Sequence, residues 1–182
     1  MTGRVALLCL GVLGGACASR PEAAPPQEGA RQEAAVATTL DCALSAPEQV
    51  KAGEPVEVLF RLSNPTSQPL YVLDWHTPLE GLRNDIFQVT RDGAEQPYQG
   101  PMMKRAAPQA DDYVTLAPGA SVEGRVDVSL GYEMRQPGRY TIAFRGRLMD
   151  VATRREDAPH PQGEFREAQV RCPEVQTTVV AP

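Results

Sequence analysis

Short runs of alternating apolar and polar side chains recur between residues 40 and 180, and this alternation limits the possible folds more than any other feature. A side-chain period of two is typical of a β-strand with one buried face. The clearest runs are residues 56–62 and 122–130, and the second of them places Leu130 on the apolar face. Further runs cover residues 40–45, 70–75, 86–90, 114–116, 140–144 and 165–172, and residues 175–180 extend the last of them.

Proline and glycine turns separate these runs, as at Asn64-Pro65, Asp92-Gly93 and Pro118-Gly119. Beyond the first 18 residues, no apolar run of helical period reaches three turns. Short strands joined by such turns indicate an all-β fold, an antiparallel immunoglobulin-like β-sandwich. We place this domain at residues 39–182, because about 140 residues can bury one such core.

The first 18 residues have the three parts of an export signal. Arg4 supplies the positive charge, residues 5–13 are apolar, and small residues follow. Ala16-Cys17-Ala18 fits an ordinary signal peptidase, which predicts a signal peptide over residues 1–18. Residues 14–17 also resemble a bacterial lipobox, which predicts a lipoprotein signal over residues 1–16 and a palmitate-type acyl chain on Cys17.

We favour the lipid anchor on Cys17, which predicts a protein held by the membrane at the bacterial cell envelope, on the outer membrane or its periplasmic face. The alternative is a soluble periplasmic or secreted protein. Residues 19–38 are rich in proline, alanine and glutamate and nearly lack large apolar side chains. Such a segment cannot bury enough surface to offset its ordering entropy, so it is predicted to be a flexible, disordered linker.

Two cysteines, Cys42 and Cys172, remain outside the export signal. In an exported protein such a pair most simply forms a disulfide. The bridge would join the first strand to the last and contribute about 4–5 kcal/mol by loop entropy. The alternative is two buried free thiols.

Composition argues against several classes of function. The net charge of -5 and the pI of about 5.1 disfavour nucleic acid as a partner. Zinc hydrolases need histidines one helical turn apart, whereas His76 and His160 are isolated and lie in loops, where a solvated side chain is the expectation. Serine-hydrolase and phosphate-binding motifs are also absent from the sequence. We therefore expect no catalytic residue, metal or cofactor, and no enzymatic activity.

A contact surface is the remaining candidate for function. Residues 75–81 carry the one tryptophan beside a proline turn, and residues 98–105 mix aromatic, thioether and cationic side chains. Such side chains are enriched at protein interfaces. The alternative is that Trp75 fills the core and that Lys104 and Arg105 are merely solvated. The predicted partner-binding residues are Trp75, Thr77, Pro78, Leu79, Glu80, Tyr98, Lys104 and Arg105.

The same residues carry a family resemblance over about residues 40–151. The pattern Trp75-x-Thr77-Pro78-Leu79-Glu80-Gly81, followed by Tyr98-x-Gly100-Pro101 and Lys104-Arg105, resembles the N-terminal, non-catalytic β domain of deuterolysin-like proteases, the peptidyl-Lys metalloendopeptidase type. In that family a zinc domain with His-Glu-x-x-His follows, and this sequence contains no such motif. A weaker similarity is to the β domain of intracellular proteinase inhibitors.

The resemblance implies a prodomain-like module that binds a protein partner, a protease such as a metalloprotease, as inhibitor or folding helper. The alternative is a structural envelope lipoprotein with no link to proteases.

Overall fold

The computed structural model describes residues 36–37 and 40–182, which form fourteen β-strands and four short 3-10 helices and no α-helix. None of the helices in this described part is long and apolar enough to cross a membrane. The predictions for the export signal, for Cys17 and for most of the linker fall outside the described residues. The all-β prediction is confirmed.

One layer of the sandwich is the antiparallel sheet β2 (Asp41–Ser45), β4 (Glu57–Ser63) and β9 (Ser121–Asp127). The alternation of the sequence explains its two faces. Val58, Phe60 and Leu62 of β4 are fully buried, whereas the residues between them face solvent. Ion pairs cross the solvent face from Glu57 and from Arg61 of β4 to residues of β9.

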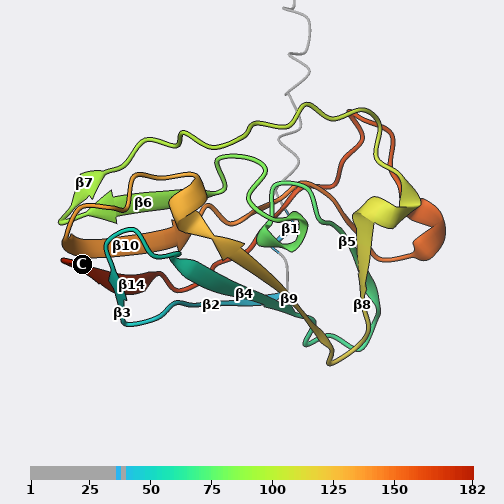
Figure 1. The fold of residues 1–182 in the computed structure, drawn as a ribbon. Helices are drawn as coiled ribbons and strands as arrows, with labels where there is room; N and C mark the ends of the chain where they lie inside the picture. Colours follow the sequence, from blue (N-terminus) through green and yellow to red (C-terminus); the bar gives the residue numbers. More distant parts are fainter. Residues whose placement is uncertain (1–35, 38–39) are drawn as a thin grey trace, which may run out of the picture. The chain divides into compact units, whose positions relative to one another are not determined.

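The second layer is a five-stranded sheet. Its order is β3 (Gln49–Lys51), β14 (Val175–Val180), β10 (Gly138–Phe144), β6 (Phe87–Arg91) and β7 (Ala94–Glu95). Figure 1 shows β10, β6 and β14 side by side, with β4 and β9 crossing beneath them. Phe144 of β10 joins the layers, since its ring meets that of Phe60 in β4 at 5.2 Å between centroids, and within its own sheet it meets the Phe87 ring of β6 at 6.2 Å.

Two smaller sheets extend the sandwich. One contains β12 (Val151–Ala152), β5 (Leu70–Leu73) and β8 (Tyr113–Leu116), and the other β1 (Val36–Ala37), β13 (Ala168–Gln169) and β11 (Arg147–Leu148). β1 pairs in parallel with β13. It lies inside the range predicted to be linker, residues 19–38.

Two strand predictions are wrong in detail. The run over residues 122–130 is a strand only as far as Asp127. The Asp127 carboxylate Oδ1 accepts from the main-chain nitrogens of Val56 and Ser129, both at 3.0 Å. This capping starts the 3-10 helix η3 (Val128–Leu130), and Leu130 is therefore 73% exposed rather than on the apolar face. Of residues 165–172, only β13 is a strand.

The predicted disulfide is confirmed. Cys42 in β2 and Cys172 before β14 are bonded, with their Cα atoms 4.7 Å apart and 130 residues between them in sequence. The bridge links the first strand of one layer to the last strand of the other.

Candidate functional site

The first part of the site is the loop before and around the 3-10 helix η1 (Pro78–Glu80). Thr77 fixes its start, since the Thr77 hydroxyl donates to the Asp74 carbonyl at 2.6 Å and accepts from the Leu79 nitrogen at 3.2 Å. Glu80, the last residue of η1, ties the helix to the preceding loop, because the Glu80 Oε1 atom accepts from the His76 main-chain nitrogen at 2.7 Å. These bonds make the loop a rigid local unit.

A glycine lets this loop lie directly on the sandwich. Gly124 is in β9, and a Cβ atom built on it would stand 2.3 Å from the carbonyl oxygen of Pro78. Nearby, Trp75 is only 4% exposed and its ring meets the Phe165 ring edge-on at 6.5 Å. The loop is thus packed as part of the core.

The second part of the site is residues 98–105, which we call the strap. Figure 1 shows the connection that contains it, in yellow-green, running from β7 along one side of the fold without regular structure. Its first end is fixed by the Tyr98 ring, 5.2 Å from the Tyr132 ring, and by a hydrogen bond of 2.8 Å from the Gln99 nitrogen to the Gly131 carbonyl.

The second end of the strap lies on the η1 loop. Arg105 forms an ion pair with Glu80, and its guanidinium carbon lies 5.2 Å from the centre of the Trp75 ring. The Met103 nitrogen also donates to the Arg83 carbonyl at 3.0 Å. The structure therefore brings together the two segments that the sequence singled out, with the strap outermost.

Burial and charge shift two ionisable groups in this cluster. Burial raises the pKa of Asp74 to about 6, helped by the neighbouring Asp112 carboxylate and opposed by Arg105. Burial also lowers the pKa of His76, as do the charges of Arg147 and Arg105.

Two buried donors here, Trp75 Nε1 and Arg105 Nε, have no hydrogen-bond partner among the described residues. Within that part of the chain, no three His, Cys, Asp or Glu side chains gather to hold a metal. The cluster combines apolar side chains, aromatic rings and one guanidinium paired with a carboxylate.

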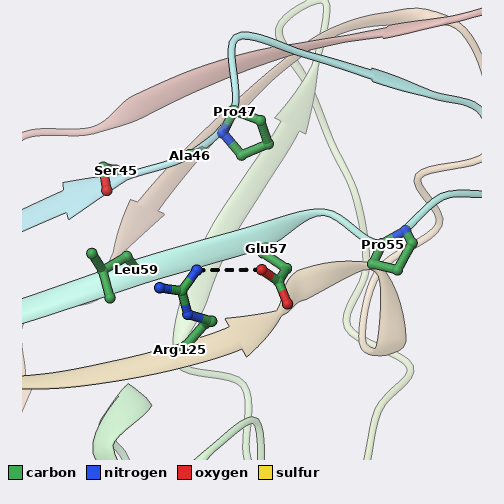
Figure 2. Close-up of a pocket in the computed structure, with 7 residues that line it drawn as sticks. All are labelled: Ser45, Ala46, Pro47, Pro55, Glu57, Leu59 and Arg125. Atoms are coloured by element: carbon green, nitrogen blue, oxygen red, sulfur yellow. Dashed lines mark hydrogen bonds and ion pairs between the residues drawn. The ribbon is translucent and has the colours of Figure 1, made fainter.

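A hollow of about 490 Å³ adjoins the first end of the strap, and its lining includes Gln99, Leu130 and Tyr132. A second hollow, of about 470 Å³, lies on the solvent face of the β2-β4-β9 sheet (Figure 2). There Arg125 reaches across to Glu57, 3.3 Å away, so the charges in this hollow already have partners. Leu130, which is 73% exposed, lines the first hollow.

A separate polar cluster lies under residues 153–166. The carboxylate of Asp150 is fully buried and accepts from the Tyr113 hydroxyl at 2.5 Å and the Arg166 nitrogen at 2.8 Å, and it is 2.7 Å from His160 Nδ1. The expectation of a solvated His160 is wrong, since that residue is 8% exposed. Its Nε2 has no partner among the described residues.

Comparison with known families agrees with this architecture. A family model for an immunoglobulin-like domain matches residues 43–163, which is more than half of the chain. The chain belongs to the immunoglobulin-like domain family.

An extracellular protease of Aeromonas hydrophila resembles this immunoglobulin-like domain in part. The two are 37% identical over 92 residues, which make up 50% of this chain and 26% of the protease. The chain thus matches about a quarter of that relative's length. The similarity is compatible with a non-catalytic domain associated with a protease.

Within the immunoglobulin-like domain, the predicted partner-binding residues divide into three groups by exposure. The buried group is Trp75, Thr77 and Pro78, which pack beneath the surface of the site. Leu79, Glu80, Tyr98 and Arg105 are partly buried, and only Lys104 is exposed.

Among the described residues, three large apolar side chains face solvent, which are Met102 at 73%, Met103 at 41% and Leu130 at 73% exposure. The segment predicted to bind a partner contains Met102 and Met103, but the list of predicted residues names none of the three. The thioether pair beside Lys104 was a usable signal for the first two residues. Leu130 was hidden because the strand pattern continues through it.

Proposed function

We propose that this immunoglobulin-like domain is an exported, non-catalytic module that binds a protease, as an inhibitor or a folding helper. The observation that carries the proposal is the exposure of Met102 and Leu130, each 73%, on a strap and a turn that touch at Gln99 and Gly131. Large apolar side chains that face solvent on adjoining segments are a common mark of a protein interface.

Two further observations support a protease as the partner. The chain shares 37% identity with part of an extracellular protease. The sequence motifs around Trp75 and Lys104 resemble the N-terminal domain of deuterolysin-like proteases, which makes a metalloprotease our preferred partner.

A direct binding measurement tests this function. The mature domain and the Aeromonas hydrophila extracellular protease would be titrated by calorimetry. We expect binding that falls at least tenfold in Met102→Glu/Leu130→Glu, because a charge at each position would have to be desolvated at the interface. The control is Ala43→Glu, an exposed position on the solvent face of β2. Absence of binding by the unaltered domain would contradict the proposal and favour a purely structural envelope protein.

We also propose that the domain is tethered to the cell envelope through an acylated Cys17. The lipobox-like residues 14–17 support this location. Mass spectrometry of the mature protein tests it. An acyl mass on Cys17 is expected, whereas an unmodified chain that begins after Ala18 would show a soluble periplasmic or secreted protein.

A further inference from the structure

The geometry of the strap points to a more specific role that rests on the proposed function. We infer that residues 100–104 enter the substrate cleft of the protease as an extended segment, with Met102 and Lys104 directed into its subsites. The domain would then be a competitive inhibitor that imitates a substrate.

The strap exposes a continuous stretch of side chains. Residues 101–104 all face solvent, with Met102 at 73% and Met103 at 41% exposure. The Arg105 side chain is only 24% exposed and turns toward the η1 loop, where it pairs with Glu80. Met102 and Lys104 therefore present one apolar and one cationic group outward.

The main chain of the strap is also available for pairing. Among the described residues, two hydrogen bonds engage the main chain of residues 100–105. The Met103 nitrogen donates to the Arg83 carbonyl, and the Pro101 carbonyl accepts from the Tyr98 hydroxyl at 2.7 Å. A segment with free N–H and C=O groups can add to a partner as a strand, and main-chain bonds then give affinity while alternate side chains give specificity.

Both ends of this segment are clamped to the domain. Tyr98 and Gln99 hold one end on Tyr132 and Gly131, and Arg105 holds the other on Glu80 and Trp75. A segment fixed in its bound shape loses little conformational entropy on binding. If the protease adds water across a peptide bond of the strap, so that the carbonyl carbon gains hydroxyl and the nitrogen gains hydrogen, the clamps keep both new ends in place.

Charge distinguishes the two basic residues of the strap. The Arg105 guanidinium is engaged by the Glu80 carboxylate, so Lys104 is the cation that the strap presents. We therefore expect the cleft to accept an apolar side chain and, two residues later, a cationic one.

Inhibition kinetics test this inference with the Aeromonas hydrophila extracellular protease and a short fluorogenic peptide. The unaltered domain should inhibit competitively, and a protease blocked by a small active-site inhibitor should bind it at least tenfold more weakly. Met102→Glu/Lys104→Glu should raise the inhibition constant at least tenfold, whereas Lys51→Glu, at an exposed lysine of β3, should leave it unchanged. Circular dichroism should show that each variant is folded.

Arg105→Ala gives a second and independent readout. Releasing one clamp should turn the strap from an inhibitor into a substrate, seen by mass spectrometry as faster cleavage within residues 100–105. Full binding to the blocked protease, or non-competitive inhibition, would overturn this inference and leave the proposed function intact. Absence of any binding to the free protease would overturn both.

Discussion

Two irregular segments cover this sandwich, and they are fastened in different ways. Residues 153–166 are held by the fully buried Asp150 carboxylate, which binds Tyr113, His160 and Arg166. The strap is held by ring contacts at one end and by a partly buried arginine at the other. Neither segment contains a β-strand.

The difference lies in what each segment leaves toward solvent. The Asp150 cluster turns its polar groups inward, where each bond is shielded from water and is costly to break. The strap instead turns its anchors inward and leaves Met102 and Lys104 outside. An irregular segment fixed by its inner side chains can offer its outer ones to a partner, and this is the arrangement we expect of a binding site.

The largest expected effect tests whether the Asp150 cluster is the stronger fastening. Asp150→Ala leaves the Tyr113 hydroxyl, the His160 ring and the Arg166 nitrogen without their acceptor, so we expect the free energy of unfolding to fall by about 3–4 kcal/mol. Urea titration followed by circular dichroism measures it. The matched change at the strap, Glu80→Ala, should cost about 1–2 kcal/mol, because its ion pair is only partly buried. Equal losses would remove the contrast between the two segments.

An intermediate effect is expected where the η1 loop rests on the sandwich. In Gly124→Ala the added methyl carbon would stand 2.3 Å from the Pro78 carbonyl oxygen, so the η1 loop must move. The atoms that this methyl group would meet are main-chain atoms of Pro78 and Leu79, which cannot turn aside as a side chain can. We therefore expect the free energy of unfolding, measured in urea, to fall by about 1–3 kcal/mol. The strap should loosen with the loop, which limited proteolysis can detect. The neighbouring change Arg125→Ala, at an exposed position of β9, serves as the control. A neutral Gly124→Ala would show that the loop is not tightly seated.

The strands followed from the sequence because one buried face imposes a period of two. In β4 this pattern places Val58, Phe60 and Leu62 inside, as observed. The pattern failed where a side chain competes with the sheet for main-chain groups. Asp127 caps a 3-10 turn, and Leu130 then leaves the apolar face although the alternation continues through it.

The sequence singled out the two segments of the candidate site but left open whether Trp75 is exposed or fills the core, and the structure shows the second alternative. The tryptophan and the strap attract attention by residue type, and type does not reveal which side chain lies beneath the other. Trp75 is buried because Arg105 and Phe165 cover it, and both come from distant parts of the chain. The burial of His160 likewise depends on Asp150 and Tyr113 meeting in space.

The smallest expected effect is a pH dependence of stability, and it arises from Asp74, whose pKa is affected by Arg105 of the strap. Burial and Asp112 raise the pKa of Asp74 from 3.8 to about 6, so the folded protein keeps this proton to higher pH than the unfolded chain does. Stability should therefore fall as pH rises from about 4 to about 6 and be unaffected by this group outside that window. Because the carboxyl is half-exposed and screened by solvent, we expect a fall of only about 1 kcal/mol.

Urea unfolding at several pH values, with Asp74→Asn beside the unaltered protein, isolates this contribution. The variant carries no titrating group at this position, so the difference between the two curves should change by about 1 kcal/mol across the window and be constant beyond it. Arg105→Gln should enlarge the change, because the arginine charge opposes the rise in the pKa of Asp74. A difference that stays constant with pH would show that Asp74 is as well solvated as an ordinary surface carboxyl. The strap would then lie less closely over Asp74 than the contacts of Arg105 imply.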